Sequence, residues 1–152
     1  MHTTYMDGLA DLHLHTTSSD GMLTPYELIQ KAYKQGLQAI SITDHDTVAA
    51  VGDAIEIARE FDIEVIPGIE VSAFENGRDI HMLGYFMDHE DENLLLYTDF
   101  FRREREKRAV RIVKKLNDIN IPLTFDEVMD CAGSGTVGRL HIAHALIAHG
   151  YT

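Results

Sequence analysis

The sequence predicts an α/β fold in which parallel strands alternate with helices. Three apolar segments, 9–15, 38–43 and 63–66, have the pattern of strands, and a helical pattern follows each of the first two. A β-α-β-α-β order predicts a parallel sheet with helices outside it. A fourth strand at 80–86 follows a turn signal at 75–79, so we expect it to run antiparallel to the third strand.

Capping signals predict where the first two helices begin. Thr24 and Glu27 form a capping-box pattern, and Gly36 ends the helix that follows. The second helix is expected at about 48–61, with Thr47 as its cap. Both helices join consecutive strands, as a parallel sheet requires.

After residue 90 the predicted elements are helices only. A long helical segment reaches about residue 117, and a last helix is expected at about 139–149. We therefore expect two parts, a β/α core over 1–90 and a helical insertion over 91–152 that begins to return to the core at its end. Parallel β/α architectures usually continue with more strands, so we expect a truncated chain or a fragment completed by another chain.

Composition indicates one globular domain. The chain has 152 residues, of which 45% are hydrophobic and 25% charged. No apolar run approaches the ~20 residues of a membrane span, and residues 1–5 lack a signal-peptide pattern. The single cysteine, Cys131, excludes an internal disulfide framework and is expected to be a structural thiol. These features predict a cytoplasmic protein without a membrane partner.

Charge is unevenly distributed along the chain. The net charge of −12 argues against duplex DNA as a partner. Eight of the 13 Lys and Arg residues lie between Arg102 and Lys115, a segment with only two acidic residues. Such a run is most often a solvated helix face. The alternative is a local positive field that steers a nucleotide or a short RNA end.

Two histidines stand side by side at the end of the first predicted strand. Side chains at i and i+2 of a strand share a face, so His13 and His15 project together, roughly 6.5 Å apart along the strand. Two imidazoles so placed can bind one metal ion, and Asp11 on the same face could orient one of them. The alternative is a polar face turned to solvent.

Further ligand-type residues follow each predicted strand. The carboxyl ends of parallel strands form one rim, where functional groups collect. Each residue has an ordinary explanation by itself, as a turn former, a helix cap, a solvated residue or a core histidine. Together they predict a metal site, and its further candidates are Asp20, Asp44, His45, Asp46, Glu70 and His81.

Six motifs in order resemble those of the PHP (polymerase and histidinol phosphatase) family. They are Asp-Leu-His-Leu-His at 11–15, Ser-Ser-Asp-Gly at 18–21, Ile-Thr-Asp-His-Asp-Thr at 42–47, Pro-Gly-Ile-Glu-Val-Ser at 67–72, Ile-His-Met-Leu-Gly-Tyr at 80–85 and Gly-Arg-Leu-His-Ile-Ala at 138–143. The last motif resembles that of the family's small phosphoesterase branch, which also has a helical insertion before it. The resemblance covers nearly the whole chain.

The resemblance implies a distorted, here partial, β/α barrel with up to three divalent metal ions. His13 and His15 would bind one metal, and Glu70 would bridge it to a second. The remaining assignments implied by motif are His81 and His141 on the second metal and Asp20 and His45 on the third. Asp44 is a candidate to support these ligands. The family's Asp-x-His pair near its C-terminus has no counterpart in this chain. The first and third metals would therefore lack ligands that the family supplies, and activity would depend on the remaining ligands.

The chemistry expected of such a site is hydrolysis of a phosphate ester. Imidazole and carboxylate ligands suit zinc, manganese or iron, and clustered divalent ions make hydroxide from water near neutral pH. The resemblance implies a small phosphorylated substrate, such as a nucleoside 3′,5′-bisphosphate or a short RNA end. Arg139 could bind its phosphate, or be a solvated arginine at a helix start.

Two alternatives remain open at this point. One is an amidohydrolase, a class that also opens with His-x-His on its first barrel strand. The other is an inactive metal-binding fragment that lacks its C-terminal ligands. The sequence makes no prediction of oligomeric state.

Overall fold

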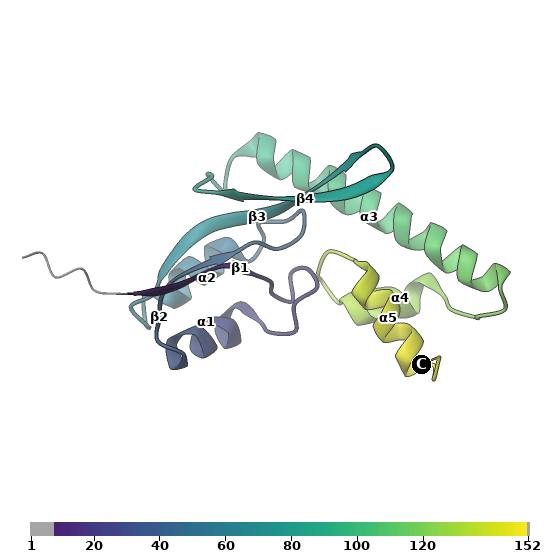
Figure 1. Cartoon of the computed structure of the whole chain (residues 1–152), viewed down its shortest axis with the longest axis horizontal. Coiled ribbons are helices and arrows are strands. Elements are labelled where there is room, and N and C mark those ends of the chain that lie inside the picture. Colours follow the sequence, from purple (N-terminus) through teal and green to yellow (C-terminus); the bar gives the residue numbers. More distant parts are fainter. Residues whose placement is uncertain (1–7, 152) are drawn as a thin grey trace, which may run out of the picture.

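The computed structural model describes residues 8–151, which form one four-stranded sheet and five helices. The strands are β1 (Leu9–Leu14), β2 (Leu37–Ile42), β3 (Glu64–Glu75) and β4 (Arg78–Tyr85). Their order in the sheet is β1-β2-β3-β4. The first three strands are parallel, and β4 returns antiparallel to β3 in a long hairpin (Figure 1). The predicted sheet, including its antiparallel fourth strand, is confirmed.

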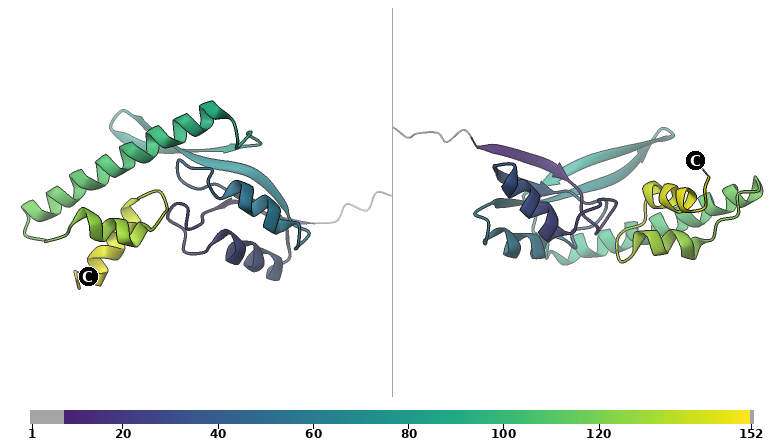
Figure 2. Two further views of the ribbon diagram at one scale, coloured as in Figure 1. Left: turned by 180° about the vertical axis from the view of Figure 1, so that it is seen from behind. Right: turned by 90° about the horizontal axis from the view of Figure 1, so that it is seen from below.

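The helices form two groups around this curled sheet. Helices α1 (Pro25–Lys34) and α2 (Val51–Ala58) cover one face of the parallel strands, as Figure 2 shows. Helix α3 (Glu92–Asp118) runs alongside the β3–β4 hairpin and extends past the sheet, as Figure 2 shows. Helices α4 (Phe125–Ala132) and α5 (Arg139–Ala148) lie beyond the sheet, toward the C-terminus.

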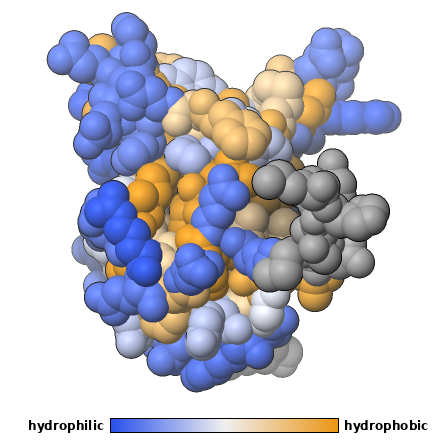
Figure 3. Space-filling view, turned by 90° about the vertical axis from the view of Figure 1, so that its left-hand side faces the viewer, coloured by the Kyte–Doolittle hydropathy of each residue, from blue (hydrophilic) through white to orange (hydrophobic). Residues whose placement is uncertain are grey.

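The sheet has an open edge at β1. Leu9 and Leu12 of this strand are exposed at 64% and 40% of their surface. Seen from the end where the described chain begins, hydrophobic side chains occupy the centre of the surface, flanked by hydrophilic ones (Figure 3). A closed barrel has no such edge, so the four strands form a partial barrel.

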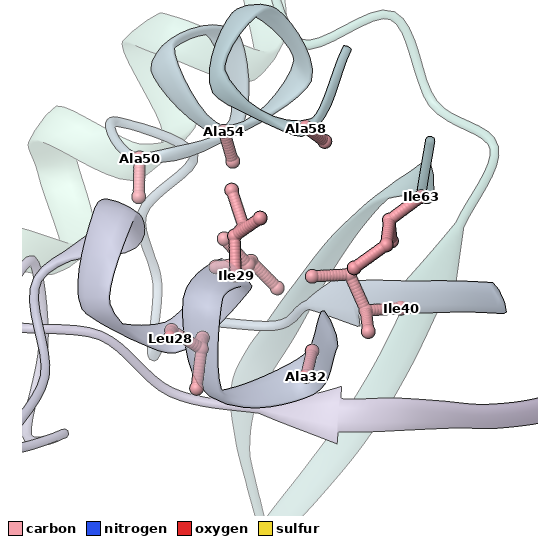
Figure 4. Packing of buried hydrophobic residues seen from close by; sticks show 9 residues of the cluster. Leu28, Ile29, Ala32, Ile40, Ala50, Ala54, Ala58 and Ile63 are labelled. Carbon is pink, nitrogen blue, oxygen red and sulfur yellow. The ribbon is translucent and has the colours of Figure 1, made fainter. Parts of the chain in front are cut away.

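The main hydrophobic core lies between the sheet and the first two helices. Ile29 of α1 is fully buried and points toward Ala50 and Ala54, while Ile40 of β2 packs beside Ile63 (Figure 4). Burying each isoleucine contributes about 1.5–3 kcal/mol. This core fixes α1 and α2 against the parallel strands and so fixes the loops at the strand ends.

A separate hydrophobic cluster holds the helical region together. Val113 of α3, Val128 of α4 and Ile142 of α5 are buried in it, together with Leu123 and Val137 from the connecting loops. The three helices therefore pack mainly on one another. Their contacts with the rest of the chain include polar ones, described with the candidate site, and the packing of Leu94 of α3 against a third cluster that contains Val51 and Ile69.

One capping signal is confirmed and the other is wrong. Thr24 and Glu27 form the predicted capping box of α1. The second helix is shorter than the predicted 48–61 and has no side-chain cap. The Thr47 hydroxyl instead accepts a hydrogen bond from the Ala49 N–H, at 3.2 Å, in the turn before α2.

Strand β3 is longer than predicted. We expected the strand to end at residue 66 and Glu70 to follow it, but β3 continues through Pro67 and Gly68. A Cβ at Gly68 would lie 2.1 Å from Ser41 Oγ on β2, so the glycine permits close strand packing rather than a turn. Glu70 therefore lies within a strand, where its side-chain direction is fixed by the pleat.

Three expectations about the chain as a whole have different outcomes. Cys131 is exposed, so the prediction of a structural thiol is wrong. None of the helices in residues 8–151 is long and apolar enough to span a membrane. The expectation for residues 1–5 lies outside the described part of the chain.

Candidate metal centre

The Glu70 carboxylate stands among four imidazoles. Its Oε2 atom lies 2.9 Å from His13 Nε2, 3.1 Å from His15 Nε2 and 3.7 Å from His45 Nδ1. Its Oε1 atom lies 2.9 Å from His81 Nδ1. The five side chains come from four different segments of the chain, and the sequence analysis named all five.

The sheet brings these segments together. His13 lies near the end of β1, and His45 follows β2 and makes an isolated parallel bridge to Glu70. Two backbone hydrogen bonds hold that bridge, from Asp46 N–H to the Glu70 carbonyl at 3.0 Å and from Glu70 N–H to the Asp44 carbonyl at 3.2 Å. The rim of parallel strand ends is thus the organising feature, as expected.

Asp20 supplies a second carboxylate to the centre, next to His15 and His45. It lies in the loop between β1 and α1, with Oδ1 3.4 Å from His15 Nδ1 and Oδ2 3.5 Å from His45 Nε2. The side chains form three donor groups, in each of which the ligand-type atoms lie within 4.8 Å of one another. These groups are His13 with His15 and Glu70, His15 with Asp20 and His45, and His45 with Glu70 and His81.

The protonation of the centre fits divalent cations. Burial lowers the pKa of His45 to about 4, against the opposing charge of Asp20, so its imidazole is neutral near pH 7. Burial would raise the pKa of Glu70, but the hydrogen bond from His13 and the neighbouring imidazoles lower it. His45 Nδ1 is buried and has no hydrogen-bond partner within residues 8–151. Imidazoles, carboxylates and a buried nitrogen without a partner are the donor set of a metal site.

Asp44 holds the loop that carries Asp20. It is 1% exposed and accepts hydrogen bonds from Thr16 N–H at 2.7 Å, Thr16 Oγ1 at 2.6 Å and Ser19 Oγ at 2.6 Å. The Asp44 carboxylate thus acts on the loop, and through it on the position of Asp20. Asp11 differs from expectation, because its carboxylate accepts from the His13 backbone N–H at 3.2 Å rather than from a ring.

His141 lies beside the centre but outside the three donor groups. It is buried in the first turn of α5, and its Nδ1 accepts a hydrogen bond from Gly138 N–H at 2.9 Å. Burial lowers its pKa, and the charge of Asp20 opposes that shift. A neutral imidazole that accepts at Nδ1 carries its proton on Nε2.

A buried ion pair attaches the helical region to the rim. Arg105 of α3 donates from Nε to Asp46 Oδ2 at 2.5 Å and from a terminal nitrogen to Ser72 Oγ at 2.7 Å. Asp46 also accepts from Ser72 N–H at 2.7 Å. Arg105 is only 6% exposed, so reading the whole basic run as a solvated face was wrong at this residue. No local signal distinguishes Arg105 from its charged neighbours.

Two more arginines meet at Asp79 on β4, two residues from His81. Arg139 lies 3.1 Å and Arg108 3.7 Å from Asp79 Oδ2. Burial, followed by the charges of Arg105 and Arg139, lowers the pKa of Arg108. The sequence analysis named Arg139 but not Arg108 or Asp79. The only sequence feature that pointed to Arg108 was the positive charge of the basic run.

Two curated relatives resemble the chain over 92% of its length. One is a 5′-3′ exoribonuclease of Haemophilus influenzae, 40% identical over 140 residues that make up 51% of that protein. The other is a 3′,5′-nucleoside bisphosphate phosphatase of Chromobacterium violaceum, 30% identical over 141 residues that make up 50% of that protein. The chain thus spans about half the length of the curated relatives it matches.

A solved structure matches the fold. The crystal structure of a protein of Bifidobacterium adolescentis, assigned as a metal-dependent phosphoesterase, superposes with a TM-score of 0.87 at 34% identity. The match covers 97% of this chain and 52% of that one, and it confirms the predicted partial β/α barrel with its helical insertion. The sequence family of the PHP domain matches residues 11–121, which is most of the chain. The chain therefore belongs to the PHP domain family.

Proposed function

We propose that the protein is a metal-dependent phosphoesterase that hydrolyses a phosphate ester of a nucleotide or of a short RNA end. The observation that carries this proposal is the Glu70 carboxylate, shared by four imidazoles within 3.7 Å. The names of the relatives, an exoribonuclease and a nucleoside bisphosphate phosphatase, support the choice of substrate.

The three donor groups would hold up to three divalent ions, with zinc, manganese and iron as the candidates. Bound divalent cations lower the pKa of water and offset the negative charge of a phosphate ester. Glu70, His15 and His45 each belong to two donor groups and would fix the spacing of neighbouring ions. His141 is proposed as a further ligand, through a change in its hydrogen bond to Gly138.

The two parts of the chain would have different roles at the site. We propose that the core over residues 1–90 supplies most of the metal donors, and that the helical insertion over 91–152 supplies cations for the substrate. Arg139 would bind a phosphate by exchanging its exposed ion pair with Asp79 for the substrate. Its guanidinium can form two parallel hydrogen bonds to phosphate oxygens.

Two other functions predict different behaviour. An amidohydrolase would act on substrates without phosphate, and the two arginines at Asp79 favour phosphate instead. An inactive fragment would bind one ion or none and release no phosphate. The second alternative is considered because the chain spans about half the length of the relatives it matches.

The test combines metal analysis with phosphate release. The wild type is expected to bind divalent ions and to release phosphate from a nucleoside 3′,5′-bisphosphate or a 5′-phosphorylated RNA. His81→Ala should lower both metal content and phosphate release, because it removes a nitrogen 2.9 Å from Glu70. His89→Ala, which lies outside the donor groups, is the matched control. Unchanged metal content and activity in His81→Ala would contradict the assignment of His81.

A further inference from the structure

A groove of about 290 Å³ opens between the β3–β4 hairpin and α3, next to the metal centre. Figure 1 shows the hairpin running alongside α3. The groove lining includes Ser72, Phe74, Asp79, Phe101, Arg108 and Arg111. None of these residues belongs to the donor groups of the metal centre.

The hairpin register aligns this groove with the metal centre. Glu70, Ser72 and Phe74 alternate along β3 and share a face. Ser72 pairs with His81 across the hairpin, and Phe74 pairs with Asp79. The groove therefore begins beside two metal-donor residues and follows the hairpin outward. The distance from Glu70 to Phe74 along the strand is roughly 13 Å.

Two aromatic side chains line the outer part of the groove. Phe74 is 72% exposed. Phe101, on the facing helix, packs against Tyr97, with ring centroids 4.4 Å apart, and is thereby held in place. A single exposed phenylalanine needs no explanation, but two on opposite walls of one groove offer faces on which a planar ring can stack.

The groove also carries an arginine, Arg111, that is not neutralised by a carboxylate of the lining. Its three carboxylates already have partners, since Asp46 pairs with Arg105, Glu104 with Lys107, and Asp79 with both Arg108 and Arg139. Arg111 makes no ion pair with any residue in the range 8–151. The lining has three arginines and three carboxylates, but every one of these carboxylates already has a partner, so the Arg111 guanidinium stays available to a ligand. An anion is the complementary ligand.

We propose that this groove binds the second nucleotide of a single-stranded oligonucleotide whose terminal phosphate lies at the metal centre. The nucleobase stacks on Phe74 and Phe101, and the following phosphate contacts Arg111. A duplex cannot bind in this way, because its bases are stacked on one another. The inference rests on the proposed phosphoesterase function and deepens it, since it favours an oligonucleotide over a mononucleotide as substrate.

The test is a binding measurement on the metal-loaded protein. Fluorescence anisotropy would compare a labelled phosphorothioate RNA tetranucleotide, which resists hydrolysis, with competing nucleoside 3′,5′-bisphosphate and duplex RNA. The single strand should bind most tightly. Phe74→Ala should weaken its binding about tenfold, which is typical of the loss of one base–aromatic contact. Arg111→Ala should lower the salt dependence of binding by about one phosphate contact.

Matched controls lie outside the groove. Phe86→Ala removes a phenylalanine of similar exposure, 78%, and Arg103→Ala removes an arginine from another face of α3. Both should leave tetranucleotide binding unchanged, and circular dichroism checks that Phe74→Ala is folded. Unchanged binding in folded Phe74→Ala, or equal affinity for single strand and duplex, would overturn the inference.

The two proposals can fail separately. Release of phosphate from the bisphosphate without any preference for the tetranucleotide would overturn the groove and leave the phosphoesterase proposal intact. Tight, Phe74-dependent binding of the tetranucleotide without phosphate release would overturn the proposed activity and leave the groove intact.

Discussion

The β/α core and the helical region differ in what holds them together and in what joins them. Each buries its own aliphatic cluster, around Ile29 in the core and around Val128 in the helices. Two kinds of contact join the regions. Leu94 of α3 packs against a third apolar cluster that contains Val51 and Ile69. The polar contacts include the buried Arg105–Asp46 pair and the hydrogen bond from Thr136 N–H to the Ser18 carbonyl at 2.8 Å.

This difference has a consequence for the metal centre. Every residue of the three donor groups lies in the core, whereas Arg105, Arg108 and Arg139 come from the helices. The polar contacts, together with the packing of Leu94, therefore set how the cations of one region face the metal donors of the other. Disturbing either hydrophobic cluster should affect stability, while disturbing the polar junction should also affect the alignment of the site.

The largest expected effect is at the junction. Asp46→Asn leaves the buried Arg105 guanidinium without its carboxylate, and breaking a buried pair on one side costs about 3–5 kcal/mol. The measurement is the free energy of unfolding from urea denaturation. Asp99→Asn, on an exposed ion pair of α3, is the control and should stay near wild type. A loss in Asp46→Asn no greater than in this control would show that the junction is not a stabilising contact.

A second pair of variants compares the two hydrophobic clusters. Ile29→Ala should cost about 2–5 kcal/mol, because it leaves a cavity at a fully buried site. Val128→Ala removes a smaller side chain and should cost less. Because the buried Arg105–Asp46 pair and Leu94 join the two regions, both variants should lower the midpoint of the same transition in thermal unfolding. Two separate transitions, each shifted by one variant only, would contradict this coupling.

A smaller effect is expected in the loop that carries Asp20. Ser19→Ala removes one of the three hydrogen bonds to Asp44 and should cost about 1 kcal/mol. Because the loop positions Asp20, metal affinity measured by calorimetric titration should also fall. Ser134→Ala, in an exposed loop of the helical region, is the control. Metal affinity equal to wild type in Ser19→Ala would show that this hydrogen bond of the loop does not affect metal binding.

The smallest effect on stability is expected at Arg139. Its side chain is 63% exposed, so Arg139→Ala should change the free energy of unfolding by no more than about 0.5 kcal/mol. The KM for a nucleoside bisphosphate should nevertheless rise about tenfold, as expected when one charge-assisted contact is lost. Metal content should be unchanged. A lower metal content with unchanged KM would contradict a role of Arg139 in substrate binding and indicate that it supports the metal centre.

Local rules were sufficient to predict the sheet and most of the candidate centre. His13 and His15 follow from strand alternation, and Asp20 and His45 from the rim formed by parallel strand ends. Glu70 was named as a candidate ligand, which stays a prediction, but it was placed after its strand instead of within it. The Pro67-Gly68 pair resembles a turn, and only the close approach of Ser41 on β2 explains why a glycine is needed within the strand.

The junction could not be predicted from local rules. Arg105 and Asp46 are 59 residues apart, and Arg105 does not differ in type from Arg102 and Arg103, which are exposed. Whether a charged side chain is buried depends on how α3 crosses the sheet, and periodicity alone does not specify that crossing. The same holds for Asp79, which gains its two arginine partners only in the folded chain.

The central claim is that Glu70 is the shared carboxylate of a metal centre. Its most direct test is calorimetric titration of manganese or zinc into the wild type, Glu70→Gln and Glu64→Gln, the last being an exposed glutamate on the same strand. We expect bound metal in the wild type and in Glu64→Gln, and a loss of most of it in Glu70→Gln. Equal metal binding in Glu70→Gln and the wild type would contradict the claim.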